Sequence, residues 1–239
     1  MEKLAHGAKK IGLNISPNQL AQFHTYYQEL VEWNKRINLT AITGYEEVQM
    51  KHFLDSLTIT LAWQAPLSKA SLRLIDVGTG AGLPGIPLKI LLPDISLVLL
   101  ESTAKKAGFL QHVVQKLKLD KVEVVTTRAE EAAHNAQYRE KFDMVLARGI
   151  APLPTLVELT LPFCTIGGNF IAQKKGAIED EINHSNKATS LMGGKLREVK
   201  RIDMEEFPDK RYLVIIEKLS ATPPQYPRRS GIPAKRPLV

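Results

Sequence analysis

The sequence predicts an α/β protein with a doubly wound, mostly parallel sheet, preceded by a helical N-terminal region. Short apolar segments alternate with helical ones from residue 72 onward, as in a parallel sheet covered on both faces. A glycine-rich loop, DVGTGAG at 76–82, follows the first apolar segment. Two extended segments near the end of the chain form a hairpin, so the last strand should run antiparallel to its neighbours.

Residues 1–67 are expected to form the helical region. Ser16, Pro17 and Gln19 match a capping box with proline in the first turn, which predicts a helix from 17 to about 35. The segment 43–46, TGYE, matches a second capping box and predicts a helix through about residue 63. Residues 66–71 are expected to be a linker.

Residues 68–218 are expected to form the sheet domain. Seven strands are predicted, at 72–77, 96–100, 122–126, 142–147, 168–173, 196–207 and 212–218. Helices are predicted at 84–92, 104–117, 152–163 and 179–191. The remaining residues, 219–239, contain five prolines and are expected to form an extended tail without a core of its own.

The net charge of +7 is unevenly distributed. Four of these charges lie in the acid-free tail, on Arg228, Arg229, Lys235 and Arg236. Such a concentration favours a polyanionic partner, although a solubilising tail would have the same composition. The sequence contains no apolar run long enough for a membrane span and no secretory signal, so we expect no membrane partner and a cytoplasmic location.

The single cysteine and the six histidines do not predict a metal site. Cys164 lies in an apolar segment and is expected to be a small core residue rather than a catalytic thiol. The histidines show no ligand spacing with it, so no metal is expected.

The glycine loop predicts a nucleoside cofactor. Gly78, Gly80 and Gly82 allow close backbone approach at the carboxyl end of a strand. Residues 80–85 also match G-x-G-x-x-G, so a dinucleotide is a serious alternative. A sulfonium cofactor, S-adenosylmethionine, is favoured because the Asp76 carboxylate can attract a positive charge and Pro84 lacks a pyrophosphate-binding N–H. The closing hairpin also fits the seven-stranded sheet of class I methyltransferases.

Further cofactor contacts are expected where the next strands end. Glu101 is positioned to accept hydrogen bonds from both ribose hydroxyls, and Ser102 and Thr103 to border the adenine side of the site. Ala129 and Glu130, after the third strand, would flank the adenine ring. These positions complete one crevice at the carboxyl edge of the sheet.

Six segments together resemble the bacterial 16S rRNA guanine-N7 methyltransferases, once called glucose-inhibited division protein B. They are WNKRINLTAI at 33–42, KHFLDSL at 51–57, the glycine segment 76–89, RAE at 128–130, Ala147-Arg148, and YPRRSGIP at 226–233. The sequence departs from the family pattern at Gly149-Ile150, where Ala-Val is usual, and by an additional lysine at 174–175.

The resemblance implies an S-adenosylmethionine-dependent enzyme that methylates a guanine in a 16S rRNA loop near the decoding site. It implies cofactor contacts at Gly78, Leu83, Ala129, Glu130 and Arg148. Guanine N7 carries a lone pair and no proton, so we expect in-line transfer by positioning and desolvation, without a catalytic acid or base. The expected partner is 16S rRNA or a small-subunit particle, bound by a monomer.

Six residues are candidates for RNA contacts: Arg36, His52, Lys174, Lys175, Arg228 and Arg229. Arg148 is a further candidate for a phosphate contact. His52 and Asp55 share a helix face, where they could pack within the protein, face the RNA or bridge domains. Two other functions stay open on the residues alone: methylation of a small molecule or protein, and a nucleotide-binding regulatory module.

Overall fold

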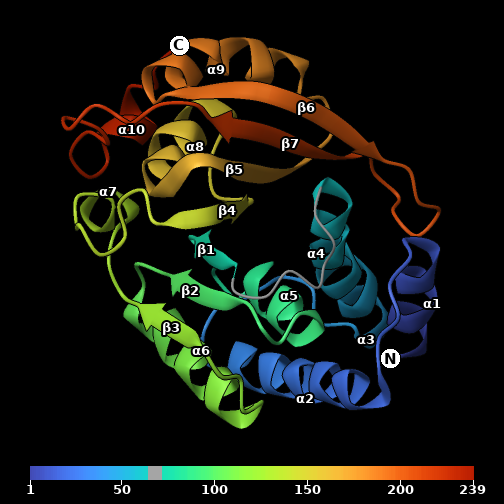
Figure 1. Ribbon diagram of the computed structural model, residues 1–239. Coiled ribbons are helices and arrows are strands. Elements are labelled where there is room, and N and C mark those ends of the chain that lie inside the picture. Colours follow the sequence, from blue (N-terminus) through green and yellow to red (C-terminus); the bar gives the residue numbers. More distant parts are fainter. Residues whose placement is uncertain (64–71) are drawn as a thin grey trace.

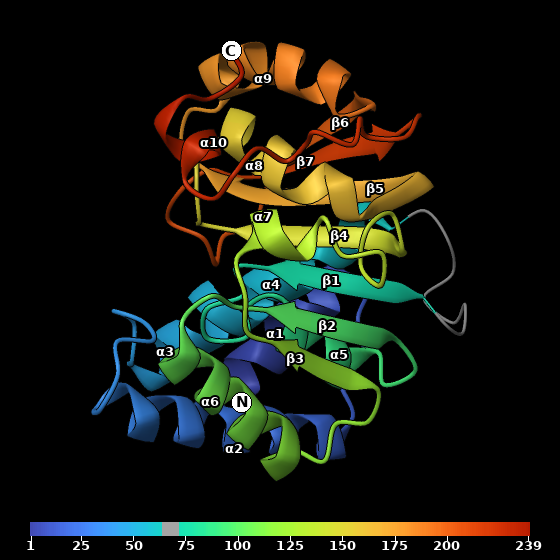
Figure 2. The ribbon, with the colours of Figure 1, turned by 90° about the vertical axis from the view of Figure 1, so that its left-hand side faces the viewer.

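The computed structural model describes residues 1–63 and 72–239, and its centre is one twisted seven-stranded sheet (Figure 1). The strand order is β3-β2-β1-β4-β5-β7-β6, as seen in Figure 2. Strands β1 to β5 pair in parallel, whereas β7 is antiparallel to both β5 and β6. This confirms the predicted sheet and its antiparallel last strand. The strands are β1 Arg73–Val77, β2 Ser96–Leu100, β3 Val122–Val125, β4 Phe142–Arg148, β5 Cys164–Lys175, β6 Gly194–Ile202 and β7 Arg211–Lys218.

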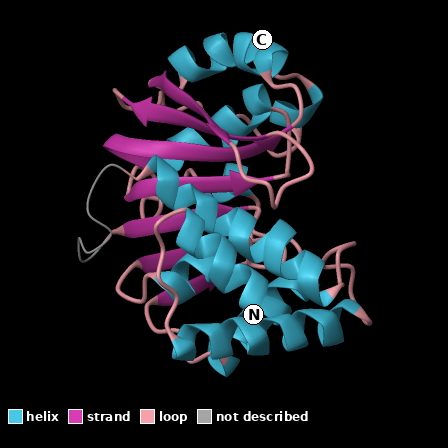
Figure 3. Cartoon of the chain, turned by 90° about the vertical axis from the view of Figure 1, so that its right-hand side faces the viewer, coloured by secondary structure: helices cyan, strands magenta, loops and turns pink. Residues whose placement is uncertain are grey.

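Alternate residues of each central strand enter two separate hydrophobic cores. In β1, Leu74 belongs to one core, whereas Ile75 and Val77 belong to the other. The first core is covered by the N-terminal helices, α5 and α6, and the second by α7, α8 and α9, so helices flank both sides of the sheet (Figure 3). The helices in these two layers are α1 Glu2–Lys10, α2 Pro17–Asn34, α5 Gly85–Leu91, α6 Ala104–Lys116, α7 Ala129–Ala132, α8 Leu153–Thr160 and α9 Glu179–Leu191. A short 3₁₀ turn, η3 Leu161–Phe163, follows α8.

The capping box at Ser16 is present, and α2 begins where the sequence predicts. The Ser16 hydroxyl accepts from the Gln19 N–H, and the Gln19 side chain accepts from the Ser16 N–H at 2.9 Å. The helix packs against α5 and α6, which fastens the N-terminal region to the first face of the sheet.

The second helical segment spans residues 45–62, close to the predicted range, but its start and its interior differ from the prediction. It comprises α3 Tyr45–Val48, a π-helical turn η1 Gln49–Leu54, α4 Asp55–Leu57 and a 3₁₀ turn η2 Thr58–Ala62. The capping box predicted at 43–46 is wrong, because Gly44 is the N-cap and no side chain caps the helix. The linker and the boundary predicted at 66–71 and 67/68 lie outside the described residues.

The tail is not a free extended segment, because it packs beside α7 and α8 and contains the short helix α10 Ile232–Lys235 (Figure 2). Tail prolines 227 and 233 are buried. Within the described residues, no helix is long and apolar enough to cross a membrane.

Candidate functional site

The glycine loop joins β1 to α5 at the carboxyl edge of the sheet. Gly78, Gly80 and Gly82 have φ angles of +67°, +61° and +89°, values that favour glycine. A Cβ atom at Gly78 would lie 2.8 Å from the Ile150 side chain. The Gly78 N–H donates to the Leu100 carbonyl at 2.9 Å, so the loop is held against the end of β2.

Asp76 is a buried carboxylate beneath this loop. Its Oδ2 accepts from the Thr79 hydroxyl at 2.6 Å and from the Gly85 N–H at 2.8 Å. Its Oδ1 is also buried but has no hydrogen-bond partner among the described residues. Burial raises the pKa of Asp76 to about 6. A carboxylate with one oxygen unpaired is suited to a cationic ligand group, which would supply the missing partner.

Glu101, at the end of β2, is fixed by two backbone amides. Its Oε2 accepts from the Gly80 N–H at 3.1 Å and its Oε1 from the Thr103 N–H at 2.8 Å. Each carboxylate oxygen can accept more than one hydrogen bond. The held carboxylate can therefore accept further hydrogen bonds from a diol such as ribose.

A cavity of about 260 Å³ lies beside the loop. Four of the predicted cofactor residues line it: Gly78, Ser102, Ala129 and Glu130. The other five, Gly80, Leu83, Glu101, Thr103 and Arg148, are not part of its lining. Leu83 is buried in the first hydrophobic core, so its side chain supports the loop from below.

The cavity-lining residues that were not among the predicted contacts include Ile150, Thr155, Gly231 and Ala234. Gly231 lies within the tail motif 226–233, so the motif itself marks this segment. Thr155 and Ala234 carry no such signal, because only packing of α8 and the tail brings them to the cavity.

Arg148, at the end of β4, points toward the helical segment 45–62. Its Nη1 donates to Asp55 Oδ2 at 2.9 Å, and its Nη2 lies 3.1 Å from His52 Nδ1. Arg211 of β7 contacts the other Asp55 oxygen at 2.7 Å. The Asp55 carboxylate thus joins the N-terminal helices to two strands of the sheet.

His52 is buried within this network, which corrects the expectation that it contacts RNA. His52 Nδ1 lies 3.1 Å from both Arg148 Nη2 and the Lys51 carbonyl oxygen, and its Nε2 lies 2.7 Å from the Thr40 hydroxyl. Burial and the Arg148 charge lower the pKa of His52 to about 4. The ring is therefore neutral at pH 7, and of the roles considered it fills the domain-bridging one.

Two more predicted RNA contacts are engaged inside the protein. The Lys174 ammonium contacts Glu181 at 2.5 Å and its side chain is 11% exposed. The Arg228 guanidinium contacts Glu158, a fully buried carboxylate, at 2.6 Å. Both cations are therefore paired with a carboxylate inside the protein, which the sequence did not predict. Lys175 and Arg229 are exposed, and Arg36 is exposed with only a loose 3.5 Å contact to Glu32.

Cys164 lies in the second core, as expected of a small core residue. Burial raises the pKa of its thiol to about 12, which makes it a poor nucleophile. Among residues 1–63 and 72–239, no group of three or more His, Cys, Asp or Glu is arranged to hold a metal ion.

Two solved structures with low sequence identity share the fold. A precorrin-6y C5,15-methyltransferase from Geobacter metallireducens matches with a TM-score of 0.50 and 14% identity, over 76% of this chain and 91% of that one. MtNAS, solved in complex with MTA and tNA, matches with a TM-score of 0.54 and 15% identity, over 82% and 69%. These likenesses support the predicted class I methyltransferase fold.

Sequence relatives are much closer and cover the chain from end to end. A Ribosomal RNA small subunit methyltransferase G from Dehalococcoides mccartyi is 52% identical over 239 residues, which is 100% of both chains. A protein of the same name from Roseiflexus castenholzii is 47% identical, again over 100% of both. The GidB family model, described as rRNA small subunit methyltransferase G, matches residues 19–211. The chain therefore belongs to the GidB family of rRNA small subunit methyltransferases.

Proposed function

We propose that this protein binds S-adenosylmethionine and transfers its methyl group to N7 of a guanine in 16S rRNA. The observation that carries the proposal is the arrangement of Asp76 and Glu101 around the glycine loop at the carboxyl edge of the sheet, with a cavity lined by Gly78 of that loop. The relatives named as ribosomal RNA small subunit methyltransferases support the choice of RNA as substrate.

The residues present fit this cofactor. The unpaired oxygen of Asp76 would face the cationic methionine part, and Glu101 would accept from the ribose hydroxyls. The cavity between Gly78 and Ala129 would hold the adenine ring. When bound, the cofactor supplies an electrophilic methyl group on a sulfonium.

The chain's own part in the reaction is to position the base and exclude water. Guanine N7 attacks through its lone pair and releases no proton, so no described residue needs to act as a general base. N7 must be exposed in a loop or flipped out of the stack before it can reach the methyl. The substrate is then either free 16S rRNA or a small-subunit particle, and we propose that a cytoplasmic monomer binds it.

Methyl transfer with tritiated S-adenosylmethionine tests the function. Naked 16S rRNA, 30S subunits and total protein are offered in parallel, and the modified base is mapped by reduction and aniline cleavage, which detects N7-methylguanine. We expect label in one guanine of an RNA sample. Label only in protein or small molecules, or at a position other than N7, would contradict the proposal.

The variant that tests the cofactor site in that assay is Glu101→Ala. It removes the carboxylate that Gly80 and Thr103 hold and should abolish most transfer by weakening cofactor binding. The matched variant Glu123→Gln, at an exposed position of β3, should retain full transfer.

A further inference from the structure

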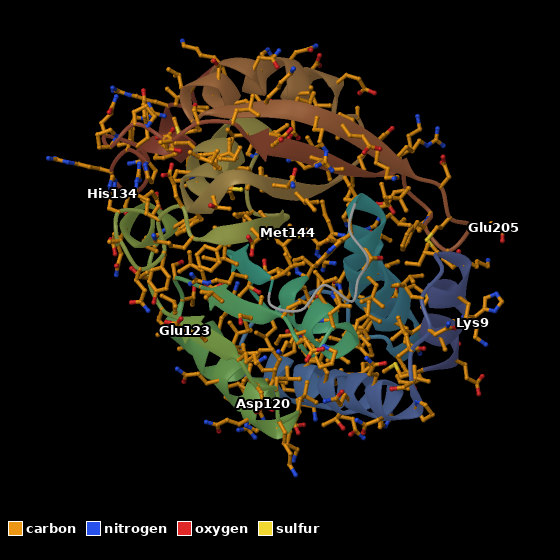
Figure 4. The ribbon with its side chains drawn as sticks, in the orientation of Figure 1. Lys9, Asp120, Glu123, His134, Met144 and Glu205 are labelled. Atoms are coloured by element: carbon orange, nitrogen blue, oxygen red, sulfur yellow. The ribbon has the colours of Figure 1, made fainter. Side chains whose placement is uncertain are left out.

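The tail, residues 219–239, is attached to the sheet domain by hydrogen bonds from side chains near α7. Arg139 donates to the carbonyls of Thr222 at 2.8 Å, Pro223 at 3.2 Å and Tyr226 at 2.9 Å. His134, labelled in Figure 4, contacts the Pro227 carbonyl at 2.8 Å. These groups of the α7 region satisfy tail backbone that has no sheet partner.

The strongest attachment is the ion pair of Arg228 with Glu158. Arg228 Nε and Nη2 donate to the two carboxylate oxygens at 2.9 and 2.6 Å, and its backbone N–H donates to the same group at 2.8 Å. Glu158 is fully buried in α8. Without Arg228, this carboxylate would be a buried and unpaired charge, so the ion pair favours the docked tail.

The next tail residues reach the candidate cofactor site. The Gly231 N–H donates to Glu130 Oε1 at 2.8 Å, and the Thr155 hydroxyl donates to the Pro233 carbonyl at 3.2 Å. Gly231 and Ala234 line the cavity together with Ala129 and Glu130. Gly231 has a φ of +84°, so the chain turns at this point in a conformation that favours glycine.

We propose that tail residues 226–234 form one wall of the cofactor site, so that tail docking and cofactor binding stabilise each other. The proposal rests on the proposed function for the identity of the ligand. A ligand that contacts the cavity gains contacts only when the tail is docked. By linkage, the ligand must then favour the docked tail by the same factor.

Calorimetric titration of the full chain with S-adenosylhomocysteine tests whether the docked tail strengthens ligand binding. Gly231→Pro removes the N–H that Glu130 accepts and cannot adopt the positive φ. Arg228→Gln removes the charge that pairs with Glu158. We expect each to raise Kd about tenfold, a coupling of ordinary size for linked sites. Lys235→Ala, an exposed residue of the same tail, should leave Kd unchanged.

Tryptic cleavage of the wild-type chain tests whether the bound ligand favours the docked tail. S-adenosylhomocysteine should slow cleavage after Arg229, which is exposed in the tail. Cleavage after Lys9 should be unaffected, since Lys9 lies on the opposite side of the molecule from His134 and the tail (Figure 4). Mass spectrometry of the fragments distinguishes the two sites.

The outcomes separate this inference from the proposed function. If the wild-type chain does not bind S-adenosylhomocysteine, the cofactor itself is wrong and both proposals fall. If it binds, but Gly231→Pro binds equally well and the tail is not protected, only the tail proposal is overturned. Thermal melting shows whether Arg228→Gln is folded. If Arg228→Gln does not fold, ligand binding by Gly231→Pro and tryptic cleavage of the wild-type chain test the tail proposal.

Discussion

At the scale of single residues, Asp76 is the group whose surroundings most constrain its role. It lies at zero exposure with two donors on one oxygen and none on the other. A buried carboxylate without a full set of partners costs stability. That cost is reasonable at a position where a cationic ligand group supplies the missing interaction.

The pKa of Asp76 predicts how cofactor affinity depends on pH. Burial raises this pKa from 3.8 to about 6, so the carboxylate is charged above about pH 6 and becomes neutral below it. The affinity for S-adenosylmethionine should therefore fall as pH decreases through 6, by about tenfold at one pH unit below the pKa. Calorimetric titrations between pH 5 and 8 measure it.

Two variants distinguish the titration of Asp76 from that of other acidic groups. Asp76→Asn should bind more weakly at pH 7 and show little pH dependence. Asp120→Asn, an exposed change distant from the loop (Figure 4), should keep the wild-type profile. An Asp76→Asn profile that still falls through pH 6 would assign the titration to another group.

At the scale of elements, the helical segment 45–62 is joined to the sheet through Asp55. Its carboxylate contacts Arg148 at 2.9 Å and Arg211 at 2.7 Å, and the two arginine side chains are 15% and 5% exposed. The helix range was predictable from the spacing of apolar residues. Its π-helical turn was not predicted. His52 within that turn and Asp55 directly after it contact Arg148 of β4, and Asp55 also contacts Arg211 of β7.

Loss of the Asp55 charge should strongly destabilise the protein. Asp55→Asn would leave the guanidinium groups of Arg148 and Arg211 without their shared counter-charge, and the loss of one partner of a buried ion pair typically costs about 3–5 kcal/mol. Urea unfolding at pH 7 measures the change. Glu47→Gln breaks an exposed pair with Lys51 on the same helical segment and should leave the unfolding midpoint unchanged. Equal effects of the two changes would show that the Asp55 network adds no stability.

At the scale of the whole molecule, some basic residues form ion pairs within the protein and others are exposed to solvent. Lys174 and Arg228 have carboxylate partners, whereas Lys175 and Arg229 are exposed. The second pair can neutralise RNA phosphates without competition from an internal carboxylate. RNA affinity should therefore depend on salt through such exposed residues.

The salt dependence gives a direct measurement of these contacts. Lys175→Ala and Arg229→Ala should each reduce the slope of log Kd against log salt by about one for binding to a 16S rRNA fragment. Fluorescence anisotropy at several salt concentrations measures it. Lys9→Ala, an exposed change on α1 on the far side from the tail (Figure 4), should leave the slope unchanged. Slopes equal to the wild type in all three variants would place the RNA elsewhere.

Sequence alone determined the strands and most helices, the antiparallel end of the sheet, the glycine loop and the family resemblance, because these follow from local periodicity and short motifs. The tertiary structure decided which charges are free and what the tail does. Arg228 and Glu158 are 70 residues apart, and His52 and Arg148 are 96 apart. No local pattern reports such pairings. Packing brings them together, and the low dielectric of the interior then makes the loss of either partner costly to the stability of the fold.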